Sequence, residues 1–312
     1  MNTLIENASE ALRQIALNQE AKNYILENKT IYHILRKAAD RYIGGETLDE
    51  AASKLKQYLS SGYKTSVEYM GENTSTSTLA ELATEEFLKI ADLITSQSLK
   101  TSIALDLSHI GLTVSRELAL ENLTKLCNRA QISNIEVMAS AENVKLTDDV
   151  LRVYTELAPK YKNLGITLQA YLYRTKDDFQ EILKYPGRIR IVKGAFEAPE
   201  SMIMRRSPEL NTAFLGYIDR LLSTRHKCSI ATHDDLIQDQ SEKLIELHSP
   251  LNEDYEFESL YGIQAQRLAR LKNNGHPAKV YFVYGSEWFL YLFNRLAEEP
   301  SNVYQAISDL VK

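Results

Sequence analysis

Short apolar runs alternate with longer amphipathic stretches through most of the chain, and the runs have the length of buried strands. In one of them, Ile166, Leu168 and Ala170 stand at alternate positions, which is the period of a strand. The strands predicted from these runs are Ser66–Met70, Ile103–Leu107, Ile135–Ala139, Gly165–Tyr171, Arg188–Lys193, Cys228–Thr232, Tyr255–Leu260 and Val280–Tyr284.

The stretches between these strands carry apolar residues at spacings of three and four, which predicts helices. After the second strand, for example, Ala119, Leu123 and Leu126 share one stripe. The remaining helices predicted between strands and at the end are 79–96, 147–164, 177–183, 210–224, 238–247, 263–271 and one that follows Gly285.

Residues 1 to about 60 also show helical spacing, interrupted at Gly44-Gly45, and Thr47 with Glu50 predicts a capping box for the next helix. Strand–helix pairs repeated in series predict an α/β fold, a (βα)8 TIM-type barrel. We expect an N-terminal helical segment over 1–62 and the barrel over 63–312. A doubly wound open sheet is the structural alternative, but it usually carries Gly-x-Gly-x-x-Gly after its first strand, and this chain lacks that motif.

Composition restricts the class of protein. A hydrophobic share of 44% and a charged share of 25% are typical of a globular protein, and a net charge of −6 gives no electrostatic sign of nucleic-acid binding. No apolar run is long enough to cross a bilayer, and no secretion signal is visible. We therefore expect a cytoplasmic protein, either free or attached peripherally to a membrane.

Cysteine and histidine usage adds two expectations. Cys127 and Cys228 stand far apart in apolar company, which favours reduced core thiols over a disulfide. The histidines are scattered and Cys-x-x-Cys is absent, so we expect no metal site.

The most informative stretch is 188–197, where a buried strand ends in Lys193, Gly194 and Ala195. Small residues let a ligand approach the backbone, and an ammonium group can donate to a phosphate, a carboxylate or a reduced ring nitrogen. The structural alternative is a strand end whose lysine merely reaches solvent.

Chemistry in a barrel lies at the carboxyl ends of its strands, so polar residues there are candidates for a site. Each alone has a structural alternative, such as capping or packing, but together they indicate a ring of polar side chains. These candidates are Glu72, Asp106, Ser108, Met138, Gln169, Tyr171, Lys193, His233, Tyr261 and Tyr284.

The last predicted helix has two faces. Phe289, Leu292, Phe293 and Leu296 form an apolar face, whereas Tyr291, Asn294, Arg295 and Glu298 follow each other at helical spacing on another. An exposed arginine–acid pair is usually worth little. Because this helix follows the eighth strand, however, we expect it to lean against the barrel mouth or its rim.

Together these segments resemble the proline dehydrogenase family, in its monofunctional bacterial form, over about residues 66–302. The motifs that carry the resemblance occur in the family's order. They are residues 169–174, 188–196, 232–233, 257–262 and 295–298, with looser matches at 70–72 and 107–112.

The resemblance implies a distorted eight-fold barrel whose final helix lies over the mouth, with noncovalently bound FAD. It implies oxidation of L-proline to Δ1-pyrroline-5-carboxylate by hydride transfer to flavin N5, and an electron acceptor such as a quinone or oxygen. Arg190 and Lys193 would contact flavin N5, the O2–N1 edge or the pyrophosphate. The full set of residues implied to hold the cofactor is Gln169, Arg190, Lys193, Gly194, Ala195, Thr232, His233 and Glu298.

The resemblance also assigns the substrate side of the site. Tyr281, Tyr291 and Phe196 would wall the substrate ring, and Arg295 would hold its carboxylate. Phe196 stands where the family usually has tyrosine, and Val283 where it has proline, and both changes are mild.

Three further departures fall in the polar shell around the proline carboxylate. The family normally has lysine at Asp106, aspartate at Met138 and a second arginine at Asn294, and the loss of that arginine leaves Glu72 without its usual gate partner. Two cations are gone and a carboxylate replaces one of them, so an anionic substrate meets a weaker, partly repulsive site.

Four functions follow as hypotheses. The first is an FAD-dependent dehydrogenase acting on proline or a related amine. The second is a family member whose substrate is another cyclic or secondary amine, or an amino-acid derivative without a free carboxylate. The third is a flavin-binding or apo barrel without turnover, and the fourth is another barrel enzyme in which Lys193 forms a Schiff base.

Overall fold

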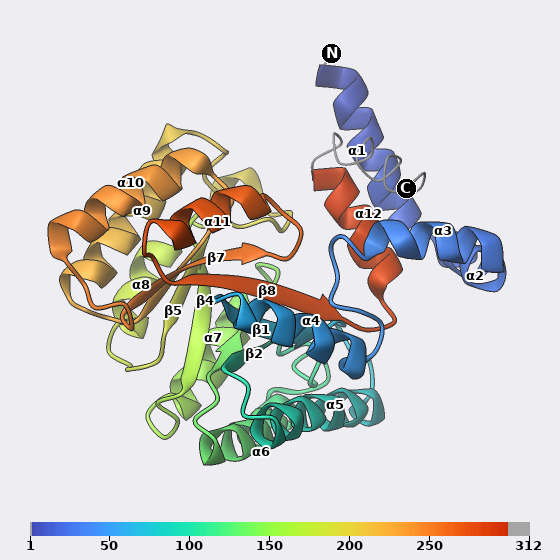
Figure 1. Cartoon of the computed structure of the whole chain (residues 1–312), viewed down its shortest axis with the longest axis horizontal. Coiled ribbons are helices and arrows are strands. Elements are labelled where there is room, and N and C mark those ends of the chain that lie inside the picture. The colour runs from blue at the N-terminus through green and yellow to red at the C-terminus, as the bar shows by residue number, and fades with distance from the viewer. Residues whose placement is uncertain (1, 299–312) are drawn as a thin grey trace.

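The computed structural model describes residues 2–298 and contains a closed barrel of eight parallel strands (Figure 1). Neighbours in sequence pair in order, and β8 closes on β1 from Lys64↔Lys279 to Tyr69↔Tyr284. This closure confirms the predicted barrel and excludes the open sheet. The strands are β1 Lys64–Tyr69, β2 Thr101–Leu105, β3 Val137–Ala139, β4 Leu164–Gln169, β5 Ile189–Val192, β6 Cys228–Ala231, β7 Tyr255–Leu260 and β8 Ala278–Tyr284.

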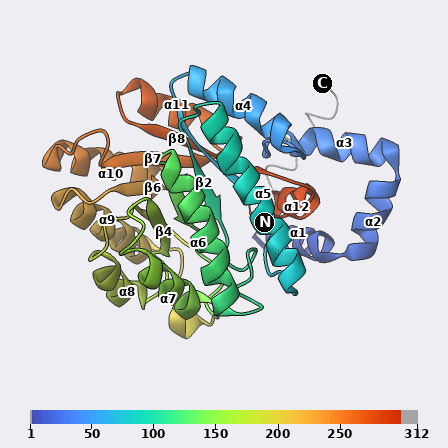
Figure 2. The same cartoon turned by 90° about the horizontal axis from the view of Figure 1, so that it is seen from below.

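Helices surround the barrel on its outer face, and a separate group stands at the end where β8 finishes (Figures 1 and 2). The N-terminal helices are α1 Asn2–Leu17, α2 Gln19–Glu27, α3 Lys29–Ala39 and α4 Leu48–Ser60. Those between strands are α5 Ser77–Ser96, α6 Arg116–Ile132, α7 Thr147–Leu157, α8 Thr175–Ile182, a short 3-10 turn η1 Glu200–Met202, α9 Pro208–Ser223, α10 Asp235–His248 and α11 Ala265–Asn273. The last is α12 Trp288–Glu298.

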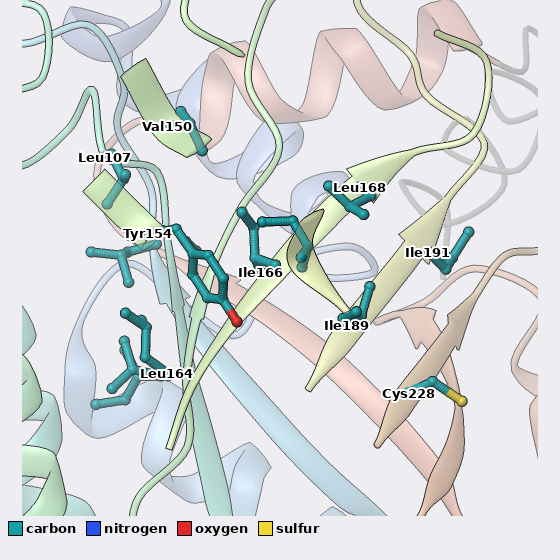
Figure 3. Packing of buried hydrophobic residues seen from close by; sticks show 14 of the residues in the cluster. Leu107, Val150, Tyr154, Leu164, Ile166, Leu168, Ile189, Ile191 and Cys228 are labelled. Carbon is teal, nitrogen blue, oxygen red and sulfur yellow. The ribbon is translucent and has the colours of Figure 1, made fainter. Parts of the chain in front are cut away.

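The main hydrophobic core lies between the outer face of the barrel and its helices. Figure 3 shows part of it, with Ile166 and Leu168 of β4 and Ile189 of β5 near Tyr154 of α7. Because strand side chains alternate between faces, burying these residues outward turns their neighbours into the barrel. Cys127 and Cys228 are buried free thiols, as expected.

The inside of the barrel is charged, whereas branched aliphatic residues dominate most barrels of this type. At the amino ends of the strands, Lys279 contacts Glu256 at 2.5 Å, and Arg188 contacts Glu136 at 2.9 Å and Glu256 at 3.6 Å. Burial opposes ionisation of Glu256, but the Lys279 and Arg188 cations outweigh it and lower its pKa. Charge pairing therefore stabilises this end of the interior.

Helix α12 forms a second core with the N-terminal helices and the carboxyl ends of β1 and β8. Trp288, Phe289 and Leu292 are buried there beside Met70 and Val283. The predicted position of the final helix at the mouth of the barrel is thereby confirmed, and α1 lies along it (Figure 2).

Two predicted details were wrong or only half right. The helix predicted over 147–164 ends at Leu157, because Pro159 has no N–H with which to continue the helical hydrogen bonds and Leu164 already pairs with β3. Thr47 caps α4 by accepting from the Glu50 amide at 3.3 Å. Glu50, however, accepts from the amide of Glu46 at 2.8 Å, so only half of the capping box forms.

Candidate active site

Arg190 of β5 lies at the centre of a polar layer inside the barrel, built from side chains of β1, β4 and β7 and from Ser140, which follows β3. Its guanidinium donates to Glu258 at 3.0 Å, to Ser140 at 3.2 Å and to Thr167 of β4 at 2.8 Å. Ser140 also donates to Glu68 at 3.5 Å. The chain Glu68–Ser140–Arg190–Glu258 thus crosses the barrel from β1 to β7, and it fixes the plane of the guanidinium group.

Carboxyl groups gather on one side of this layer. Burial raises the pKa of Glu68 to about 7, with Glu142 adding to the rise and Arg190 opposing it. Burial, together with the charges of Glu68 and Glu142, raises the pKa of Asp106 well above its ordinary value. Glu142 accepts from the backbone N–H of Ser108 at 3.0 Å, and burial raises its pKa as well. The like charges therefore cannot all be ionised together.

Lys193 directly follows a buried strand, as the sequence predicted, and it forms an ion pair that the sequence did not reveal. Lys193 Nζ contacts Asp234 Oδ2 at 2.6 Å, and Asp234 also caps α10 by accepting from the Ile237 amide. Gly194 has a φ of +105°, and a Cβ there would come within 2.1 Å of the Tyr171 ring. The backbone after β5 therefore needs glycine, and the lysine is held toward the end of β6.

The end of β6 presents Thr232 and His233. His233 Nε2 accepts from the Leu260 amide at 3.1 Å, which assigns the ring proton to Nδ1 in the neutral tautomer. Burial, together with the nearby Arg295 cation, lowers the pKa of His233 to about 4. At neutral pH this ring is an uncharged donor, and Arg295 of α12 lies close enough to influence it.

Gln169, the last residue of β4, has 4% of its surface exposed. Its Nε2 donates to the carbonyl of Glu142 at 2.9 Å, whereas its Oε1 has no hydrogen-bond partner within the described chain. A buried carbonyl without a partner is costly, so this atom is placed to accept from a ligand.

Aromatic rings accompany the two arginines. Arg190 lies 5.1 Å from the centre of the Tyr281 ring, and Arg295 lies 5.1 Å from the Tyr291 ring. Tyr291, Asn294 and Arg295 are partly buried, and the side chain of Glu298 lies outside the described part of the chain. One cation–π pair thus joins β5 to β8 across the barrel, and the other lies on α12.

The other predicted residues take different positions. Met138 is 3% exposed, and its side chain fills the interior beside Gly165. Phe196 is partly buried, its carbonyl accepting from the Tyr171 hydroxyl at 2.9 Å, and Ala195 is exposed. Glu72 lies on the loop after β1 with much of its surface exposed, although the surrounding protein still desolvates its carboxyl group enough to raise the pKa.

Tyr261 and Tyr284 do not belong to the site, so that part of the predicted ring was wrong. The Tyr284 hydroxyl donates to Glu86 of α5 at 2.9 Å, and Tyr261 stacks on Phe282 at 4.6 Å. Both rings therefore face the helical layer, which strand alternation would have predicted because Tyr284 and Phe282 share a face.

The acidic partners Glu68, Glu142, Asp234 and Glu258 were missed by the sequence reasoning. One pattern could have revealed two of them. Glu256 and Glu258 alternate within a strand, as do Ser66 and Glu68, so polar groups line the inner face of both strands.

Residues 2–298 lack two features that would change the interpretation of the site. No helix in this range is long and apolar enough to cross a membrane. No cluster of three or more histidine, cysteine, aspartate or glutamate side chains within it has an arrangement suited to a metal ion.

Among solved structures, proline utilization A (PutA) from Bdellovibrio bacteriovorus, inactivated by N-propargylglycine, has the same fold, with a TM-score of 0.81 at 18% sequence identity. The similarity covers 95% of this chain and 36% of that longer one, so the chain spans about a third of PutA.

Sequence comparison is more specific. Proline dehydrogenase 2 of Bacillus subtilis (strain 168) is 31% identical over 277 residues, which cover 89% of this chain and 91% of that protein. Proline dehydrogenase 1 of the same strain is 29% identical over 294 residues, 93% of this chain and 97% of that protein. The family profile described as "Proline dehydrogenase" matches residues 51–306. The resemblance seen in the motifs is confirmed, and the chain belongs to the proline dehydrogenase family.

Proposed function

We propose that the protein is an FAD-dependent dehydrogenase that oxidises the carbon–nitrogen bond of L-proline or a closely related amine. With L-proline the product would be Δ1-pyrroline-5-carboxylate. The observation that carries this proposal is the set Gln169, Lys193 and His233 at the carboxyl ends of the neighbouring strands β4, β5 and β6, with Arg190 lower on the inner face of β5. When bound, the flavin supplies a hydride acceptor at N5, and a quinone or oxygen would reoxidise it.

The residues present fit a flavin. Gln169 Oε1 is a buried acceptor without a partner, and a flavin ring carries an N–H group that could donate to it. Arg190 and Lys193 supply positive charge, which stabilises a reduced, anionic ring or a pyrophosphate. Gly194 and Ala195 let a ligand approach the backbone. Thr232, His233 and Glu298 complete the proposed cofactor set.

The chain's own residues have separate tasks in the reaction. Arg190 is held by hydrogen bonds to three side chains, so its charge stays in one position through the reaction. Tyr281, Tyr291 and Phe196 would exclude water and orient the substrate ring. Arg295 would hold a substrate carboxylate through charged hydrogen bonds worth about 1.5–3 kcal/mol.

A second candidate substrate is a cyclic or secondary amine, or an amino-acid derivative, without a free carboxylate. The raised pKa values of Asp106 and Glu68 favour it, because they reflect a concentration of acids where the family places a lysine. With Asp106, Met138 and Asn294 in the substrate shell, we expect free L-proline to bind weakly. A flavin-binding protein without turnover is the remaining alternative.

Purified protein tests the function directly. Acid precipitation should release free FAD, and the bound flavin should lose its visible absorbance under anaerobic conditions when an amine substrate is added. A yellow protein that no amine bleaches would indicate flavin binding without turnover. A protein that stays colourless with added FAD and gives no binding heat would contradict the proposal.

A further inference from the structure

We propose that the mouth of the barrel selects an amine without a free carboxylate and first binds it as an ammonium ion at Asp106, Glu68 and Glu142. One of these carboxylates then accepts the ammonium proton, because hydride transfer requires the electron pair of the neutral amine. This inference rests on the proposed function and adds the charge of the substrate to it.

The charges at the mouth do not balance. Glu68, Asp106 and Glu142 influence one another electrostatically, and Arg190 is the cation that acts on both Glu68 and Asp106. Arg190, however, already forms an ion pair with Glu258 at 3.0 Å. The hydrogen bonds to the other carboxylates come from Ser140 and the Ser108 amide, which are neutral. Around Glu68, Asp106 and Glu142, carboxyl groups therefore outnumber the cation that acts on them.

Neutral acceptors point into the same interior. Ser66 is 1% exposed and Ser102 is 8% exposed, and neither hydroxyl has a hydrogen-bond partner in the described chain. The two residues pair in register across β1 and β2. Val67 and Ile103 are buried in the outer core, so Ser66 and Ser102 face inward on the same face as the carboxylates.

These hydroxyls strengthen the case for a cationic ligand. Ser66 precedes Glu68 by two positions and therefore lies directly beneath it on the inner face of β1. Hydroxyl oxygens and carboxylates are the acceptors that an N–H donor needs, and an ammonium group is a donor without an acceptor. Asp106 is partly accessible, whereas Glu68 and Glu142 are buried, so Asp106 would meet the ligand first.

The protons bound to Asp106 and its neighbouring acids give the proposal a measurable consequence. The groups that face Asp106 are Glu68 and Glu72 from β1 and its loop, Glu142 from the loop after β3, and Arg190 from β5. Burial and mutual repulsion raise the pKa values of these acids, and that of Glu68 reaches about 7. An ammonium ion favours the ionised form, so its binding releases protons and strengthens as the pH rises toward 8. A ligand carboxylate has the opposite preference.

L-prolinamide and L-proline form a matched pair of probes, because they share the ring and its amine and differ in having an amide or a carboxylate. Their binding to the FAD-loaded protein is measured by anaerobic calorimetry at pH 8 in phosphate and in Tris, which differ in ionisation enthalpy. We expect L-prolinamide to bind at least tenfold more tightly than L-proline, with proton release visible as a heat that depends on the buffer. Equal or tighter binding of L-proline, without proton release by the amide, would overturn the proposal.

Asp106→Asn tests the assigned residue. Loss of one charged contact should weaken L-prolinamide binding about ten- to hundredfold and leave L-proline binding equal or improved. The control is Glu86→Gln, which removes a carboxylate on the outer helix α5, outside the barrel interior, and should change neither affinity. An unchanged preference in Asp106→Asn would refute the role of Asp106. If that variant does not fold, the two probes on the natural protein decide the question alone.

Failure of the proposed function gives a different result. Protein that binds no FAD, or whose FAD no amine reduces, would refute the dehydrogenase proposal and this inference with it. Flavin that L-proline bleaches at lower concentration than L-prolinamide would leave the dehydrogenase intact and refute the inference only.

Discussion

Replacing Glu68 with glutamine should make the protein more stable at pH 8, although it removes a buried charged group. Burial raises the pKa of Glu68 from an ordinary 4.5 to about 7. Below about pH 4 the carboxyl is protonated in both the folded and the unfolded chain. As the pH rises, the unfolded chain ionises first, so the folded state loses stability until the pH has passed about 7.

The size of the effect follows from that gap. The interval between 4.5 and about 7 corresponds to about 3 kcal/mol, since one pKa unit is worth about 1.4 kcal/mol. Asp106 and Glu142 interact with the same carboxyl group, so the gain in stability cannot be assigned to Glu68 alone. We therefore expect Glu68→Gln to raise the free energy of unfolding by about 1–3 kcal/mol at pH 8, and by much less at pH 5.

Urea unfolding of the FAD-saturated protein at both pH values measures the effect. Glu256→Gln is the matched control, because Glu256 is also a buried glutamate inside the barrel but contacts Lys279 at 2.5 Å. Breaking that pair should destabilise the protein by about 3–5 kcal/mol. If Glu68→Gln and Glu256→Gln lower the free energy of unfolding equally at pH 8, the result would contradict the inference that the carboxyl groups around Glu68 lack a balancing cation.

Three further changes test the site. Lys193→Ala should weaken FAD binding about ten- to hundredfold while the melting temperature of the apoprotein stays nearly constant, and unchanged affinity in a fluorescence titration would show that Lys193 is only a strand end. Gly194→Ala should lower the melting temperature by several degrees, because the φ of +105° suits glycine and the new Cβ would lie 2.1 Å from the Tyr171 ring. A variant as stable as the natural protein would contradict this expectation. Asp106→Lys, Met138→Asp and Asn294→Arg together should improve L-proline oxidation, whereas single changes will do less because neighbouring charges couple. No gain in the kcat/KM for L-proline would mean that its carboxylate is held elsewhere.

The fold could be predicted because its pattern is local. All eight strands were identified from apolar runs, and the errors lie at their ends. Strand β2 begins at Thr101, two residues before the predicted start, because Thr101 and Ser102 pair with Thr65 and Ser66 of β1, and the Thr101 and Thr65 hydroxyls also bond at 2.7 Å. Such a contact between polar residues of different strands leaves no trace in the hydrophobic pattern.

The sequence named the two cations of the candidate site but not the carboxylates that contact them, and the reason is sequence distance. Lys193 and Arg190 stand in a recognisable motif, but their partners lie 41 and 68 residues away, at Asp234 and Glu258. Only closure of the barrel brings those strands together. The motif residues therefore carried the prediction, while the electrostatic balance required the structure.

That balance differs between the two ends of the barrel, and the difference is itself an argument about function. At the amino end, the cations Lys64, Arg188 and Lys279 meet the carboxylates Glu136 and Glu256 in direct contacts. At the carboxyl end, Arg190 is shared among Glu258 and a group of acids whose pKa values are raised. Buried like charges cost stability and persist where a function uses them. At the amino end the charged side chains pair with each other and stabilise the fold. At the carboxyl end a cationic ligand would neutralise the carboxylates.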